Sequence, residues 1–332
     1  MRKVKVAAIQ PTINDGDYRS NLDATIRLLE RAGSEGCDIV TTSEDVCVNT
    51  YYATDVDAVD KFKALVETTE PLIVESFGKI AKKYSMYIIG AYIAKRSGVY
   101  YNLASVFDRN GNITGEYRKT HLPANETWLI TPGNEINVFK LDFGTIGISI
   151  CYDMMFPESV RTLALKRAEI IFHPTFGYGW YEEIGEMALR VRANDYGVYI
   201  VTSVPCSGQR RPGRSSIIDH WGYVLDDALY KTNTIVTAEI DLDAQKTQGD
   251  WYINGVITGY IDVSERMKAE RRPELYDAVC DTSIERVKVR NPEEQQKISQ
   301  WLKEEKVRWD EVYRHHIDKI VDELKFENTI KY

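Results

Sequence analysis

One stretch decides the fold: Gly147-Ile148-Ser149-Ile150-Cys151-Tyr152-Asp153, followed after two methionines by Phe156-Pro157-Glu158. The small and apolar residues before the cysteine predict a buried strand. Proline suits the first position of a helix, where its missing N–H is not needed, and a glutamate just after it is favoured by the positive end of the helix dipole. The stretch therefore predicts a strand, a sharp turn at the cysteine and then a helix.

The cysteine at this turn is a candidate nucleophile. Backbone N–H groups near the start of a helix stabilise a thiolate, which is the reactive form of the side chain. A buried core cysteine is the alternative interpretation of Cys151 taken alone. Its role therefore depends on what the rest of the chain brings to it.

Composition narrows the class of protein. With 332 residues, 43% apolar and 28% charged, the chain can form one large α/β domain or two smaller ones. Its net charge of -8 argues against nucleic acid or an anionic membrane as a main partner, so we expect small molecules or proteins. The five cysteines are irregularly spaced, and the short apolar run at the start does not make a signal peptide. We expect a cytoplasmic protein.

The first half alternates strands and helices. Residues 4–10 and 37–42 read as buried strands on either side of a segment with helical spacing, which predicts an α/β start with a right-handed crossover. The second of these strands delivers Glu44 at its carboxyl end. A partly buried carboxylate is a candidate general base. A helix cap or a surface ion pair is the alternative.

The next segments predict a helix, a sheet and a lysine. Residues 58–84 have a helical pattern that we expect to break near Pro71. Strands at 86–95 and 100–108 lead into the turn 109–112, which is typical of a hairpin. The returning strand ends at Lys119, with Glu126 seven residues on. This pair is either an ordinary surface ion pair or a fixed cation that faces an oxyanion.

The second half repeats the alternation. The helices at 157–167 and 181–196 are each followed by a strand, at 169–174 and 199–204, and a hairpin and a last strand follow up to residue 242. This order predicts one layered α/β domain. The charged tail at 292–324 carries apolar residues roughly on one face, which predicts a helix. That helix packs either on a second subunit or on its own domain.

Three separated pieces now coincide in order: the strand ending in Glu44, Lys119-Thr120-His121-Leu122 with Glu126, and Cys151 in its strand and turn. Together they resemble the nitrilase superfamily of carbon–nitrogen hydrolases, whose signature is a Glu–Lys–Cys triad. The similarity extends over residues 4–242, and residues 271–276, Arg-Arg-Pro-Glu-Leu-Tyr, resemble the ending of amidase and carbamoylase members.

The resemblance implies a fold and an assembly. The fold is an α/β four-layer αββα sandwich that dimerises, with a hydrolase domain at 1–265 and a C-terminal extension at 266–332. We expect the extension to be helical and to contact a second subunit in a homodimer or larger homo-oligomer. The expected partners are a small-molecule substrate and water, with no nucleic acid, no membrane, no cofactor and no metal.

The resemblance also assigns roles. Glu44 takes the thiol proton, Cys151 attacks the electrophilic carbon, and Lys119 with the backbone N–H of Tyr152 holds the oxyanion. Ammonia leaves, and water hydrolyses the resulting thioester. Glu126 matches the second glutamate of the family and helps to position the substrate.

The residues after the cysteine bear on the substrate. Nitrile-cleaving members usually have tryptophan and glutamate there, so Tyr152 and Asp153 favour an amide or an N-carbamoyl compound; a small nitrile is the alternative. Some amidase members carry an arginine where this chain has Met155, which cannot make a bidentate pair with a carboxylate. Arg210, Arg211 and Arg214 are either substitute anchors or solvated loop charges.

The resemblance places further side chains around the pocket: Tyr51, His173, Phe176 and Trp180. Such an aromatic wall suits an apolar or aromatic substrate. His173 is equally well explained as a buried core histidine.

Other classes fit less well. The sequence has no HExxH or CxxC pattern for a metal hydrolase and no GxSxG turn for a serine hydrolase. A non-catalytic binding or assembly protein on the same fold is the alternative from another class. It has no physical need for Glu44, Lys119 and Cys151 together.

Overall fold

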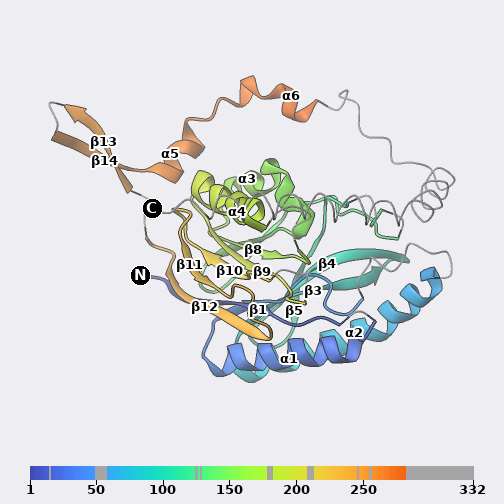
Figure 1. The fold of residues 1–332 in the computed structure, drawn as a ribbon. Coiled ribbons are helices and arrows are strands. Elements are labelled where there is room, and N and C mark those ends of the chain that lie inside the picture. The colour runs from blue at the N-terminus through green and yellow to red at the C-terminus, as the bar shows by residue number, and fades with distance from the viewer. Residues whose placement is uncertain are drawn as a thin grey trace, which may run out of the picture. The chain divides into compact units, whose positions relative to one another are not determined.

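The computed structural model describes residues 1–14, 16–48, 58–123, 126–127, 129–177, 182–207, 213–244, 247–253 and 256–281 (Figure 1). Its contacts divide the chain into two units, Met1–Arg272 and Pro273–Tyr332. The sequence placed the division at 265/266, inside α5 (Val263–Ala269), which groups with the first unit. In the second unit the described elements are a 3-10 turn at Pro273–Leu275 and α6 (Asp277–Cys280). The expected helix at 292–324 lies outside the described residues.

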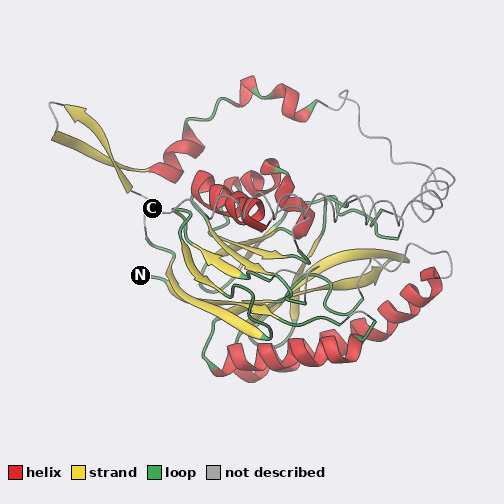
Figure 2. Ribbon diagram, viewed as in Figure 1, coloured by secondary structure: helices red, strands yellow, loops and turns green. Residues whose placement is uncertain are grey.

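Two six-stranded sheets form the centre of the first unit (Figure 2). The first has the order β12-β1-β2-β3-β4-β5 and the second the order β11-β10-β9-β8-β7-β6. The strands of the first sheet are β1 (Lys3–Gln10), β2 (Ile39–Thr41), β3 (Tyr87–Arg96), β4 (Val99–Phe107), β5 (Ile113–Arg118) and β12 (Thr234–Asp241). Those of the second are β6 (Val138–Lys140), β7 (Thr145–Ile148), β8 (Ile170–Pro174), β9 (Tyr199–Ser203), β10 (Ser216–Ile218) and β11 (Val224–Asp227).

Both sheets follow one pairing pattern. In the first, β1, β2 and β3 are parallel, with β12 antiparallel on one side and β4 and β5 antiparallel on the other. In the second, β7, β8 and β9 are the parallel strands, with β6 on one side and β10 and β11 on the other. The two halves of the chain therefore repeat one topology, although no repeat is evident in the sequence.

Three hydrophobic clusters define the layers. Helices α1 (Tyr18–Ser34) and α2 (Ala58–Tyr84) pack on the outer face of the first sheet, and α3 (Pro157–Leu165) and α4 (Glu182–Tyr196) pack on that of the second. Between the sheets, Val6, Ile148 and Phe172 belong to a separate cluster. Successive strand residues alternate between clusters, as Ile171 and Phe172 do, because strand side chains point to opposite faces. The predicted αββα sandwich is confirmed.

One helix and two strand details differ from the predictions. Helix α2 runs unbroken through Pro71, which is exposed, while Val66, Ile73 and Phe77 on its other face are buried against the sheet. Water can therefore bond the carbonyl that proline leaves without a donor. The strand before the nucleophile ends at Ile148, earlier than predicted, and the hairpin of β13 (Thr247–Ile253) and β14 (Val256–Asp262) was not predicted. Among the described helices, none has the length and apolar character to cross a membrane.

Candidate active site

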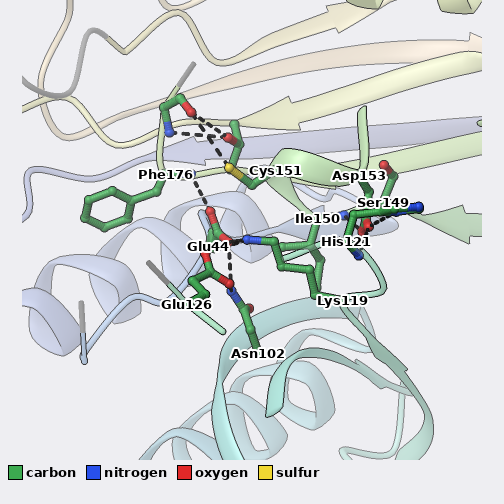
Figure 3. Close-up of polar contacts among 12 residues, drawn as sticks. Glu44, Asn102, Lys119, His121, Glu126, Ser149, Ile150, Cys151, Asp153 and Phe176 are labelled. Atoms are coloured by element: carbon green, nitrogen blue, oxygen red, sulfur yellow. Dashed lines mark hydrogen bonds and ion pairs between the residues drawn. The ribbon is translucent and has the colours of Figure 1, made fainter. Parts of the chain in front are cut away.

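The candidate residues lie where strands end. Glu44 follows β2, Lys119 follows β5 directly, and Cys151 comes after β7 (Figure 3). Strand β2 in the first sheet and strand β8 in the second are each the central one of three parallel strands. Their ends lie close together, as shown by the N–H of Glu44, after β2, which donates to the carbonyl of Thr175, after β8, at 3.4 Å. The fold thus brings together the residues that the sequence predicted, from segments far apart in the chain.

The centre of the site is a buried ion cluster. Lys119 Nζ donates to Glu44 Oε1 and to Glu126 Oε1, both at 2.7 Å, and the lysine has no exposed surface. Burial lowers the pKa of Lys119, but the charges of Glu44, Cys151 and Glu126 outweigh it and raise the pKa well above its usual value. Burial and the nearby Glu44 raise the pKa of Glu126 to about 7, against the pull of Lys119. Because its own pKa is raised, the Lys119 ammonium stays charged at neutral pH.

Asn102, from β4, is part of this cluster and was not predicted. Its Nδ2 lies 2.8 Å from Glu44 Oε1 and 3.5 Å from Glu126 Oε2, so it donates between the two carboxylates. The signal in the sequence is a polar residue within a mainly apolar strand, and that signal does not say which side chains the amide meets.

The candidate nucleophile, Cys151, sits on a strained turn. Cys151 has a left-handed backbone (φ 45°) and opens the 3-10 helix η2 (Cys151–Met155), and its thiol points to the carbonyl of Gly177, 3.8 Å away. Burial raises the pKa of the thiol to about 12; Glu44 adds to this effect and Lys119 opposes it. The thiol is therefore favoured over the thiolate at neutral pH, which fits the expected transfer of its proton to Glu44. The N–H of Tyr152 belongs to the first turn of η2, where helical N–H groups have no intrahelical acceptor.

Asp153 fastens this turn to the lysine segment. Its buried carboxylate accepts from the N–H of Ile150 (2.9 Å), just before the nucleophile. It also accepts from Tyr117 OH (2.7 Å), Thr120 Oγ1 (2.9 Å), and the backbone N–H (2.9 Å) and Nδ1–H (2.8 Å) of His121. These hydrogen bonds outweigh burial and lower the pKa of Asp153. The Asp153 carboxylate thus holds the backbone next to Cys151 and the segment next to Lys119 in fixed positions relative to one another.

The predicted pocket residues are only partly placed. Tyr152, Met155 and Phe176 are partly exposed, and the N–H of Phe176 donates to Glu44 Oε2 at 2.9 Å. His173 is fully buried, and its Nδ1–H donates to the carbonyl of Ser149 at 2.8 Å. Burial lowers its pKa to about 4, so the ring is neutral.

The remaining predictions concern charged and aromatic loop residues. Arg214 pairs with Glu186 and Asp227, so it is not a solvated loop charge. Tyr51, Trp180, Arg210 and Arg211 lie outside the described residues. Within the described ranges, no group of three or more His, Cys, Asp or Glu side chains is placed to hold a metal ion.

The four-layer sandwich and this Glu–Lys–Cys cluster together define the class: they have the layout of the nitrilase superfamily. A family model described as carbon-nitrogen hydrolase matches residues 5–248. An omega-amidase of Xenopus laevis is 30% identical over 237 residues, 67% of this chain and 83% of that protein. An N-carbamoylputrescine amidase of Arabidopsis thaliana is 27% identical over 298 residues, 83% of this chain and 94% of that protein.

Solved structures agree with the fold. A variant of the amidase from Nesterenkonia sp. AN1, with the acetamide moiety of fluoroacetamide covalently added at its active-site cysteine, superposes with a TM-score of 0.68. It is 18% identical, and the match covers 83% of this chain and 97% of that one. The chain belongs to the carbon-nitrogen hydrolase family, as its motifs predicted.

Replacing Asp153 tests how much its hydrogen bonds to the turn of Cys151 and to the segment after Lys119 stabilise the fold. In Asp153→Asn an amide N–H₂ would face N–H and O–H donors, so we expect the free energy of unfolding to fall by about 2–4 kcal/mol near neutral pH. Because the folded-state pKa of Asp153 is lowered, its contribution is present above its unfolded pKa and is lost as pH falls through the folded value. The difference in the free energy of unfolding between wild type and Asp153→Asn should therefore narrow below about pH 4. Urea unfolding over a pH series measures this difference.

The exposed Glu75, paired with Lys79 on α2, supplies a control. Glu75→Gln should change stability very little, since such surface pairs contribute little. An Asp153→Asn protein as stable as wild type at neutral pH would contradict the role given to this carboxylate.

Proposed function

We propose that this protein is a thiol-dependent hydrolase that cleaves the C–N bond of a small amide or N-carbamoyl compound and releases ammonia. The observation that carries the proposal is the position of the Cys151 thiol beside the buried ion pair of Glu44 and Lys119 (Figure 3). A thiol that is neutral at working pH needs a base at the moment of attack. Glu44 is the carboxylate in place to serve as that base.

The first half-reaction forms the thioester. The Cys151 sulfur bonds to the carbonyl carbon while its proton passes to Glu44, and the carbonyl electron pair moves onto oxygen. The Lys119 ammonium and the N–H of Tyr152 stabilise this oxyanion. When the C–N bond breaks, the leaving nitrogen takes the proton from Glu44 and departs as ammonia. The acyl group stays on the sulfur.

The second half-reaction regenerates the enzyme. Glu44, again ionised, takes a proton from water, and the hydroxyl attacks the thioester carbon. Collapse of the second tetrahedral species expels the sulfur, which regains the proton. An amide yields a carboxylic acid. An N-carbamoyl compound yields a carbamic acid, which breaks down to carbon dioxide and an amine.

The substrate class rests on the residues beside the nucleophile and on the relatives. Tyr152 and Asp153 replace the tryptophan and glutamate usual in nitrile-cleaving members, and the relatives named above are an omega-amidase and an N-carbamoylputrescine amidase. Met155 supplies no charge for a substrate carboxylate, which favours a neutral substrate. A small nitrile and a non-catalytic assembly role remain as outcomes of the test.

Ammonia release over a panel of primary amides, N-carbamoyl compounds and nitriles tests the proposal. We expect wild type to release ammonia from an amide or carbamoyl substrate, with carbon dioxide only from the latter. Cys151→Ala should lose activity by at least about a thousandfold, because the acyl acceptor is gone. Glu44→Gln should also be inactive, since an amide cannot take the thiol proton. Melting curves serve to show that both variants fold.

Wild-type-like turnover in folded Cys151→Ala would sink the mechanism. Activity on nitriles alone would move the enzyme to the nitrilase alternative. Silence across the panel from folded wild type would favour the assembly role.

We also propose a homo-oligomer in the cytoplasm. On α4, Ile184, Met187 and Val191 lie on one helical face and are 46%, 61% and 43% exposed, and Met187 and Val191 line a groove with Trp221. Exposed apolar groups gathered in this way suit contact with a second copy. All five cysteines are free thiols, which is typical of a reducing compartment.

A charge on this face should weaken the assembly. We expect wild type to run as a dimer or larger species in size-exclusion chromatography with light scattering, and Met187→Asp to shift it towards monomer. Leu72→Asp, on an exposed position of α2 (41%), is the matched control and should leave the mass unchanged. A monomeric wild type would contradict the proposal.

A further inference from the structure

The two oxygens of the Glu44 carboxylate have different surroundings. Oε1 accepts from Lys119 Nζ at 2.7 Å and from Asn102 Nδ2 at 2.8 Å. Oε2 accepts from the backbone N–H of Phe176 at 2.9 Å. Each carboxylate oxygen offers about two lone-pair sites. Oε1 therefore has both in use, whereas Oε2 keeps one for a further donor.

That remaining lone pair lies on the side of the nucleophile. Phe176 immediately precedes Gly177, whose carbonyl is 3.8 Å from the Cys151 sulfur, and Figure 3 shows the Glu44 carboxylate turned towards that sulfur. We propose that Oε2 is the atom that takes the thiol proton, and that Asn102 is a positioning residue that holds Oε1 and so keeps Oε2 turned towards the sulfur. This inference rests on the proposed function of the site.

Stability alone does not explain an asparagine at this position. Asn102 is 1% exposed, and within the described part of the chain its Oδ1 is a buried atom without a hydrogen-bond partner. A buried amide with an unsatisfied oxygen weakens a fold, and an apolar side chain of similar size would avoid that cost. What the amide supplies is a donor without charge, placed between Glu44 and Glu126.

The absence of charge matters because the surroundings of Glu44 are already crowded with titratable groups. Lys119, Glu126, Cys151 and His173 all face it. Asn102 holds Oε1 without adding a further charge to these groups. Without its donor the carboxylate is free to turn, and Oε2 no longer faces the thiol in the orientation that proton transfer needs.

Asn102→Leu tests this directly, and Asn102→Ala provides a second variant if the leucine does not fold. With an amide that wild type cleaves, kcat and KM are measured from about pH 5 to 9. We expect kcat to fall about ten- to a hundredfold near neutral pH, the effect of losing a hydrogen bond to a charged group, with KM within about threefold.

Ser105→Ala is the matched control. Ser105 lies on the same strand, is buried, and bonds Tyr92 OH at 2.7 Å, on the face that packs on the helices. We expect this variant to keep the wild-type profile. An unchanged kcat in folded Asn102→Leu or Asn102→Ala, or the same fall in kcat in Ser105→Ala, would overturn the assignment.

A second measurement separates this inference from the proposed function. Alkylation of Cys151 by iodoacetamide, followed by mass spectrometry, needs no amide turnover. If wild type cleaves no amide, the proposed function fails, but Asn102→Leu should still be alkylated several-fold more slowly than wild type below neutral pH. Equal alkylation rates across the pH range would overturn the role of Asn102 independently of the substrate.

Discussion

The burial of one ammonium group between two carboxylates is the constraint on which the rest of the structure depends. Lys119 has no exposed surface, and a charge removed from water is tolerated only when its partners are in place. Glu44 and Glu126 supply those partners at 2.7 Å. Because Glu44 follows β2 and Lys119 follows β5, the cluster forms only when both strands occupy one sheet in native register.

The same cluster sets the state of the nucleophile. Burial and the charge of Glu44 raise the pKa of the Cys151 thiol, so the proposed attack needs the transfer of the thiol proton to a base. The position of the sulfur is set by the left-handed turn and by Asp153, which bonds both to that turn and to the segment of Lys119. A carboxylate outside the ion cluster thus fixes the distance between nucleophile and cation.

The sequence predicted those parts of the site that follow from local pattern. Glu44, Lys119 and Cys151 each follow a strand, and their order along the chain matched a family. Asn102 could not be found in this way, because its importance depends on which face of β4 meets the carboxylates, a matter of sheet register. The unbroken helix at Pro71 was likewise missed, since solvent exposure decides it.

The central claim is that the reaction passes through a thioester on Cys151. The most direct test measures how the acyl group is divided between water and a second nucleophile, hydroxylamine. A primary amide and an N-methyl amide of one acid are hydrolysed in the presence of hydroxylamine, and hydroxamate and free acid are measured. A common acyl-enzyme predicts the same ratio of hydroxamate to acid from both substrates, and no hydroxamate with Cys151→Ala. Ratios that differ between the two amides, or ammonia release with no hydroxamate at all, would contradict the account.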